Sequence, residues 1–401
     1  MKRCIYIVDD QVAVLETAVM ILRGSDDSWE VAGFSDPLVA LAAVKTRAPD
    51  LVLSDQLMPG MQGSQLLEEV RNVAPAAIRV IMSGYVSLSK LTLITSAHQY
   101  IAKPFDINKL RELVQRSFSA QERIVNKGLQ TMATSLRSIP SLPQVHQSLL
   151  AELQDNRSAS SVIARMVGED PGLSIKVLQL ANSPLFGQGS LITNPTDAVM
   201  CLGTEMIAAI VLSQSLFRHY EALGHAELDL PKVWAHSWET AYLGQLLCRQ
   251  KRLPRRAAEE VFLAGLLHEA GRFILVDNFP GQFAAACQGA RQLRSPLGPR
   301  LLETFQTTPA QLTAYLMELW GMPPNVVTAI SFQDNPQQEP GGAFSITSAL
   351  YVADLIASRK TPADEFALEE WNLAYLRSIG CEADIPIWKD PAFPFENGQK
   401  H

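Results

Sequence analysis

The sequence predicts a doubly wound α/β domain of about 120 residues, followed by an all-helical domain. Short apolar runs alternate with helix-length segments up to about residue 105, and beyond that point nearly the whole pattern is helical. The chain has 401 residues, more than one hydrophobic core usually serves, so we expect at least two domains.

Five β/α units are predicted in the first part of the chain. The strands are expected at residues 4–8, 29–33, 51–54, 78–82 and 98–101. Helix-length segments, for example 11–23 and 63–73, separate them. Residues 5–8 and 51–53 are apolar throughout, as is typical of parallel strands covered by helices on both faces. A five-stranded parallel sheet is therefore predicted.

A long connecting helix is predicted over residues 106–137, because apolar residues keep helical spacing throughout this stretch. Such a helix would act as a lever or dimer seam, or would pack on its own domain; the pattern leaves both open. Pro140 and Pro143 end it. We expect the first domain at 1–120, the second at 138–357, and a C-terminal helix with an irregular tail at 358–401.

Composition limits the classes of function. Hydrophobic residues make up 47% and charged residues 19%, and no apolar run is long enough to span a membrane. The first residues lack the apolar core of a signal peptide, so a cytoplasmic protein without membrane contact is expected. The net charge of −7 argues against nucleic acid as a ligand. Five scattered cysteines without a C-x-x-C pair favour neither disulfides nor a thiolate zinc site.

Charged and hydroxyl side chains follow four of the predicted strands. Asp9 and Asp10 follow the first strand, Asp55 the third, Ser83 the fourth and Lys103 the fifth. The carboxyl ends of parallel strands meet at one edge of a sheet, so these side chains should converge. Clustered carboxylates repel one another unless a hard cation lies among them, which favours a Mg²⁺ site.

This set resembles the receiver domain of two-component response regulators, over residues 1–120, and implies a flavodoxin-like fold. By that resemblance Asp55 accepts a phosphoryl group from a histidine kinase or phosphotransfer protein. Mg²⁺ would be held in the acidic pocket of Asp9, Asp10 and Asp55, with the backbone carbonyl of Leu57. An aspartate nucleophile assisted by a metal and an ammonium group is a chemically sensible phosphoryl acceptor.

Three further residues take roles from the same resemblance. Ser83 and Lys103 would contact the phosphoryl group. Tyr100 would switch between outward and inward rotamers when the Ser83 hydroxyl is drawn to the phosphate. The alternative for Tyr100 is an ordinary half-buried strand tyrosine.

The second part of the chain resembles the HDOD domain, a helical relative of HD-type metal phosphohydrolases. The resemblance rests on the segments 139–143, 168–173, 180–187 and 262–271. HDOD domains are usually without demonstrated hydrolysis and often lie in signalling proteins. The resemblance therefore implies an output domain that binds a downstream signalling protein, and a homodimer is a further expectation.

The metal ligands of an HD enzyme would correspond to His236, His268, Glu269 and Asp354. Glu269 stands where the enzymes carry aspartate, and its extra methylene should displace the carboxylate from a metal. Gln333 and Asp334 stand where bimetallic relatives carry a histidine pair. We therefore expect no metal here, buried hydrogen-bonded histidines instead, and no enzyme activity beyond the receiver's own phosphorylation and dephosphorylation. The alternative is a receiver-gated, metal-dependent phosphohydrolase acting on a nucleotide or cyclic dinucleotide.

Overall fold

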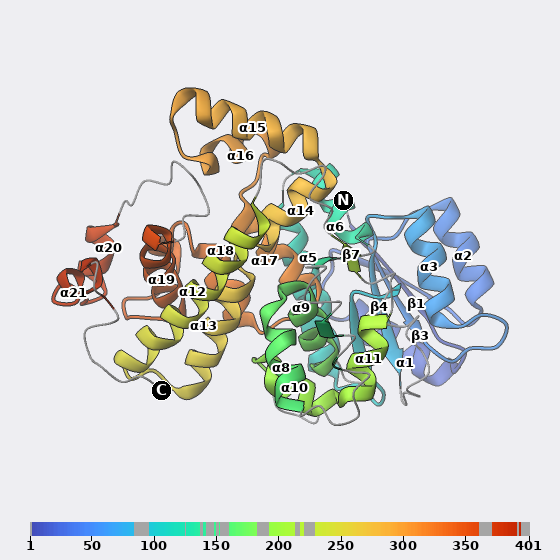
Figure 1. The fold of residues 1–401 in the computed structure, drawn as a ribbon. Helices are drawn as coiled ribbons and strands as arrows, with labels where there is room; N and C mark the ends of the chain where they lie inside the picture. The colour runs from blue at the N-terminus through green and yellow to red at the C-terminus, as the bar shows by residue number, and fades with distance from the viewer. Residues whose placement is uncertain are drawn as a thin grey trace. The chain divides into compact units, whose positions relative to one another are not determined.

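The computed structural model describes residues 2–83, 96–124, 126–136, 139–141, 148, 149, 152, 160–182, 192–212, 217–219, 229–360, 371–390 and 393. The chain forms two compact units (Figure 1). The first combines Met1–Tyr220 with Tyr315–Met322, and the second combines Glu221–Ala314 with Pro323–His401. Among the described helices, none has both the length and the apolar character needed to cross a bilayer.

A five-stranded parallel sheet lies at the centre of residues 1–120 of the first unit, as predicted. Its strands are β1 (Arg3–Val8), β2 (Trp29–Phe34), β3 (Leu51–Asp55), β4 (Ile78–Ser83) and β5 (Gln99–Ala102). Their order is β2-β1-β3-β4-β5. The order reverses beside β1, which opens a crevice at the carboxyl ends of β1 and β3.

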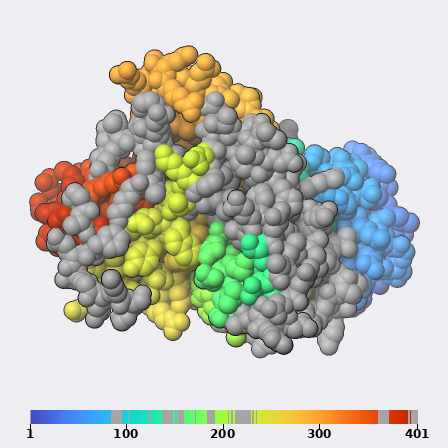
Figure 2. Space-filling view, viewed as in Figure 1, coloured from blue at the N-terminus to red at the C-terminus, as the bar shows by residue number. Residues whose placement is uncertain are grey.

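Helices cover both faces of this sheet. Helices α1 (Val12–Arg23) and α5 (Ile107–Arg123) pack on one face, and α2 (Pro37–Thr46) and α3 (Gly63–Val73) pack on the other. The outer sides of α2 and α3 form the blue surface in Figure 2. Asp36 caps α2 and Asp106 caps α5, because each side chain accepts hydrogen bonds from the first turn of its helix.

The predicted continuous helix over 106–137 is wrong. The structure contains two helices, α5 and α6 (Lys127–Ser135), because Ile124 is extended and ends the first. The side-chain amide of Gln130 donates to the carbonyls of Gln121 and Ile124, at 2.6 and 2.5 Å, and so satisfies the exposed end of α5. Asn126 caps α6 through Leu129 N.

The remainder is helical apart from one short parallel strand pair, β6 (Ile139–Ser141) with β7 (Phe217–His219). Pro140 lies in β6, whereas Pro143 is outside the described residues. The other helices of the first unit are α8 (Ser160–Glu169), α9 (Pro171–Ala181), α10 (Pro195–Leu202) and α11 (Thr204–Leu212).

The described secondary-structure elements of the second unit are all helices. Its elements are α12 (Leu230–Gln250), α13 (Arg255–Leu267), α14 (Ala270–Asn278), α15 (Pro280–Leu293), α16 (Leu297–Phe305), α18 (Pro324–Phe332), η1 (Pro336–Gln338), α19 (Ile346–Lys360), α20 (Leu373–Ser378) and α21 (Ile385–Lys389). Helix α17 (Pro309–Leu319) belongs to this unit up to Ala314 and to the first unit from Tyr315. Helices α20 and α21 lie within residues 358–401, where a C-terminal helix and an irregular tail were expected; Pro386 fits the first turn of α21, where a proline needs no N–H partner.

Candidate functional site

The carboxyl edge of the sheet brings the predicted acceptor residues together. Asp55 is the last residue of β3, and Lys103 directly follows β5. The Lys103 ammonium lies 2.6 Å from Asp9 Oδ2 and also pairs with Asp55 Oδ1. The second Asp55 oxygen, Oδ2, accepts a hydrogen bond of 2.7 Å from Leu57 N. Asp9 is fully buried and Asp55 is 5% exposed, so water screens these charges only weakly.

The backbone beside Asp55 requires a glycine at the start of α3. A Cβ atom on Gly63 would lie 2.0 Å from the Asp55 carbonyl oxygen, a separation that no side chain tolerates. Gly63 therefore allows α3 to begin directly against the acceptor strand. In the sequence, this requirement for a residue without a Cβ atom is visible only as a glycine eight positions after Asp55.

The acidic residues fit a divalent cation. Asp10 Oδ1 is buried and has no hydrogen-bond partner among the described residues. Burial raises the pKa of Asp9, although the bonds from Lys103 and Gln11 N partly offset that effect. A buried carboxylate oxygen without a partner is a ligand of the kind that Mg²⁺ prefers, so Asp10, with Asp9 and Asp55, could hold this ion.

Ser83 and Lys103 line one open pocket together with Asp55 and Leu57. Ser83 ends β4, and Ala102 lies opposite it in the neighbouring strand. The pocket therefore presents a carboxylate, a hydroxyl and an ammonium group to a ligand that enters from solvent. Gly84, which follows Ser83, lies outside the described residues.

Tyr100 lies in β5 but does not line that pocket. Its side chain is 6% exposed and packs with the core residues on the α2 and α3 side of the sheet. Burial raises the pKa of its phenol above the ordinary range. The structure therefore places Tyr100 as a buried tyrosine.

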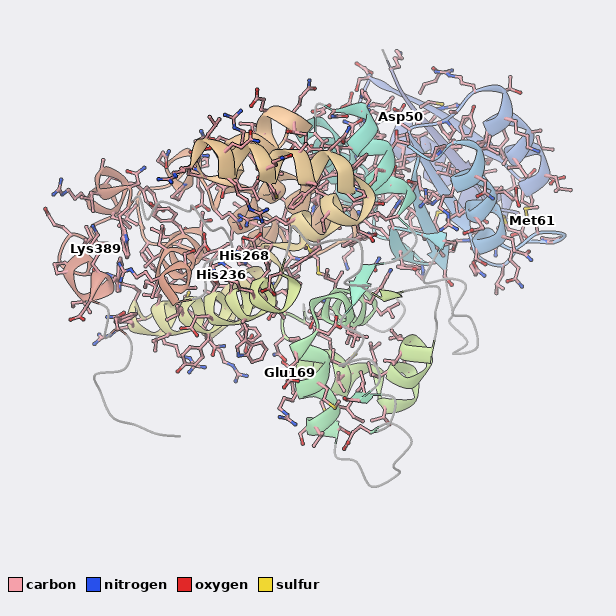
Figure 3. The ribbon with its side chains drawn as sticks, turned by 45° about the horizontal axis from the view of Figure 1, so that its top comes forward. Asp50, Met61, Glu169, His236, His268 and Lys389 are labelled. Carbon is pink, nitrogen blue, oxygen red and sulfur yellow. The ribbon has the colours of Figure 1, made fainter. Side chains whose placement is uncertain are left out.

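The four residues of the expected degenerate HD site also converge, within the second unit. His236 comes from α12, His268 and Glu269 from the turn between α13 and α14, and Asp354 from α19. The two histidines lie side by side, with ring centroids 5.3 Å apart (Figure 3). A Cβ atom on Gly265 would lie 2.6 Å from the Ala241 Cα, so this glycine allows α12 and α13 to cross closely enough for the contact.

Hydrogen bonds orient both imidazoles. His236 Nε2 lies 2.8 Å from Asp354 Oδ1. His268 Nδ1 donates to the Gly265 carbonyl at 2.6 Å, which leaves its Nε2 directed at two carboxylates. That nitrogen is 3.7 Å from Glu269 Oε1 and 3.7 Å from Asp354 Oδ1.

These contacts shift the pKa values of the cluster in consistent directions. Burial alone would lower the pKa of His268, but the Asp354 and Glu269 carboxylates outweigh it, and the net shift is upward. Burial would raise the pKa of Asp354, but the hydrogen bond from His236 and the nearby His268 imidazole outweigh it, and the net shift is downward. Among the described residues, however, His236 Nδ1 and His268 Nε2 are buried without a hydrogen-bond partner, so the cluster satisfies itself only in part.

The Glu269 carboxylate lies close to both histidines. Ligand atoms of His236, His268 and Glu269 all lie within 4.8 Å of one another. The sequence interpretation missed Arg272, whose Nε lies 2.8 Å from Glu269 Oε2. The spacing of three residues between them was the available signal. Gln333 is buried at the C-terminal end of α18.

Family models match both parts of the chain. The model of the response regulator receiver domain matches residues 5–115, and the model of the HDOD domain matches residues 139–336. Among solved structures, the MmoQ response regulator from Methylococcus capsulatus is 22% identical, with a TM-score of 0.48, and the match covers 63% of this chain and 99% of that chain.

Curated relatives match over part of their length. An uncharacterized protein of Treponema pallidum is 22% identical over 255 residues, which are 63% of this chain and 48% of that protein. The DNA-binding transcriptional regulator NtrC of Salmonella typhimurium is 32% identical over 120 residues, which are 29% of this chain and 24% of that protein. The chain thus spans about half or less of the length of these relatives. From the two family models and the parallel sheet together, the chain carries an N-terminal response regulator receiver domain followed by an HDOD domain.

Proposed function

We propose that this protein is a response regulator that accepts a phosphoryl group on Asp55 and acts through a non-catalytic HDOD domain that binds a downstream protein. A histidine kinase or phosphotransfer protein would donate the group. The observation that carries the proposal is the pairing of Lys103 with both Asp9 and Asp55 at one edge of the sheet.

The residues of the pocket suit phosphoryl transfer. Leu57 N holds Asp55 Oδ2, which leaves Oδ1 to attack phosphorus. The bond from phosphorus to the donor's imidazole nitrogen breaks, an acyl phosphate forms on Asp55, and the leaving imidazole takes up a proton from solvent. Lys103 then transfers its contact from the carboxylate to a phosphoryl oxygen, and Ser83 donates to another. Mg²⁺, when bound by Asp9, Asp10 and Asp55, neutralises charge on the transferring oxygens.

Labelling with a small phosphodonor tests the acceptor. We expect acetyl phosphate with Mg²⁺ to phosphorylate wild-type protein, and Asp55→Asn to abolish the label. Asp36→Asn is the matched control, because Asp36 caps α2 away from the pocket and asparagine caps equally well. Equal labelling of Asp55→Asn and wild type would show that the acceptor is another residue.

The ion pair between Glu269 and Arg272 supports a non-catalytic HDOD domain. A metal needs the Glu269 carboxylate as a ligand or base, yet a guanidinium group already pairs with one of its oxygens. His236 and Asp354 likewise satisfy each other. Replacing these bonds costs free energy, which offsets part of the free energy that a bound cation would supply.

Elemental analysis with hydrolysis assays tests this second half of the proposal. Protein purified without chelator should hold far less than one equivalent of Fe or Mn and should not hydrolyse cyclic dinucleotides. Arg272→Gln should increase metal binding, because it releases Glu269. Near-stoichiometric metal in wild type, lost together with turnover in His268→Ala, would instead favour the metal-dependent phosphohydrolase.

A further inference from the structure

Helix α17 belongs to both compact units of the chain. Its residues up to Ala314 are part of the second unit, and Tyr315–Met322, which includes its C-terminal end, is part of the first. Although this segment lies within the residues matched by the HDOD model, it packs with the receiver. One short helix therefore takes part in two separate sets of contacts.

The receiver buries the end of α17 in its own core. Leu319 is fully buried and clusters with Ile101 of β5 and with Leu110 and Val114 of α5. Trp320 is 7% exposed and lines a pocket with Gln99 and Arg116. Apolar burial of this extent is the main stabilising term in such contacts.

Polar bonds fix the same segment on the receiver. Arg116 of α5 pairs with Glu318, with Nε and Oε1 2.5 Å apart, and donates to the Met322 carbonyl at 3.2 Å. Gln99 of β5 donates to the Glu318 carbonyl at 3.1 Å. Because the Glu318 side chain is only 8% exposed, the pair is largely shielded from water. We call Gln99, Arg116, Glu318 and Met322 the α17 latch.

The two receiver elements of the α17 latch both lead to the acceptor pocket. Strand β5, which begins with Gln99, runs directly into Lys103. Phe105, two residues before α5 begins, lines the Asp55 pocket. Lys103 follows β5 and Phe105 precedes α5, and these two elements contribute Gln99 and Arg116 to the α17 latch. A change in the contacts of Lys103 would therefore act on both elements.

The N-terminal half of α17 contacts the turn that carries His268 and Glu269. Thr313 Oγ1 accepts a hydrogen bond of 2.8 Å from Gly271 N, and it lies 3.3 Å from the His268 carbonyl oxygen. A Cβ atom on Gly271 would lie 2.2 Å from the Pro309 carbonyl oxygen, so α17 and this turn are in direct backbone contact. All of these contacts lie within the second unit.

We propose that α17 is the element through which the receiver communicates with the histidine and carboxylate cluster of the HDOD domain. Phosphorylation of Asp55 draws Lys103 to the phosphoryl group, weakens the α17 latch and loosens the turn at His268 through Thr313. The inference rests on the proposed function, since it takes Asp55 as the acceptor. Beyond that function, it specifies the route, from Lys103 through the α17 latch and Thr313 to the turn at His268. It also specifies the sign of the effect, since the latch is weaker in the phosphorylated protein.

Hydrogen exchange of the full chain, with and without beryllofluoride and Mg²⁺, tests the proposal. In wild type, beryllofluoride should accelerate exchange in 315–322 by roughly tenfold, the factor expected on losing one charge-assisted hydrogen bond. The Gly271 amide should also exchange faster. Arg116→Gln and Glu318→Gln should accelerate both regions without beryllofluoride. The control Arg300→Gln removes a solvent-exposed Arg–Glu pair within one helix, Arg300 with Glu303, and should change neither.

Thr313→Val separates the two ends of the path. It should accelerate exchange of the Gly271 amide while leaving the beryllofluoride response of 315–322 intact, and Thr313→Ser, which keeps the hydroxyl group, should behave as wild type. Unchanged exchange in 315–322 of a protein that labels on Asp55 would overturn the α17 proposal and leave the acceptor assignment standing. Failure to label Asp55 would overturn both. If Glu318→Gln does not fold, Arg116→Gln and Thr313→Val still decide the result.

Discussion

Arg79 is a buried cation in the receiver, and its hydrogen bonds join β4 to α6. Arg79 is 1% exposed and donates to the carbonyls of Ser96 and Thr134, while its backbone N–H donates to His98 Nδ1 at 3.0 Å. An acceptor at Nδ1 places the His98 proton on Nε2, which lies 2.9 Å from the Thr134 carbonyl. Burial, followed by the Arg79 charge, lowers the pKa of His98 well below its ordinary value, so His98 stays neutral.

Lys176 of α9 is a second buried cation in the first unit, and its charge costs stability. It is 7% exposed, its ammonium donates to Gln179 Oε1 at 3.1 Å, and it has no acidic partner among the described residues. Burial lowers its pKa from 10.5 to about 8. A lysine whose folded pKa is depressed loses its proton earlier in the folded state, so the free energy of unfolding rises with pH between about 8 and 10.5.

We therefore predict that Lys176→Met stabilises the protein at pH 7, by up to roughly 3 kcal/mol, and removes this rise with pH. Urea denaturation at pH 7 and pH 10 measures both effects. Lys232→Met, at an exposed position near the start of α12, should change neither. A variant that is less stable than wild type at pH 7 would mean that the bond to Gln179 outweighs the burial of the charge.

At the scale of elements, the strands could be predicted from their amino-acid pattern alone. The predicted strands agree with β1 to β5 within one or two residues at each end, and α3 spans the predicted 63–73. Continuous apolar runs specify strands buried on both faces, and the polar residues after them specify the functional edge. The convergence of Asp9, Asp55 and Lys103 follows from the strand order.

The break between α5 and α6 could not be predicted from periodicity, because apolar spacing continues across it. It depends on side-chain bonds that join separate turns, from Gln130 back to the carbonyls of Gln121 and Ile124. Thr134 then fixes α6 to the receiver, since its carbonyl accepts from Arg79 and its hydroxyl donates to the Pro75 carbonyl. Of the two roles left open for this stretch, packing on its own domain is the one that α6 adopts.

At the scale of the whole molecule, the boundary between the two family matches is not the boundary between the two compact units. Residues 315–322 lie in the HDOD match but pack with the receiver, about 200 positions away in the chain. No pattern in the sequence assigns Leu319 to one core or the other, because an apolar residue at helical spacing fits any apolar partner. Only the tertiary contacts decide it.

We predict that Leu319→Ala destabilises the receiver, although the substitution lies outside the receiver match. Leu319 is fully buried among Ile101, Leu110 and Val114, and removing a leucine from such a core costs about 2–5 kcal/mol. Hydrogen exchange of the β1 and β3 amides should therefore accelerate. Leu302→Ala is the matched control, because Leu302 is 47% exposed and truncating its side chain leaves no buried cavity. Unchanged exchange in β1 and β3 of Leu319→Ala would mean that the receiver core is complete without α17, and the stability of the receiver would then be independent of the HDOD domain.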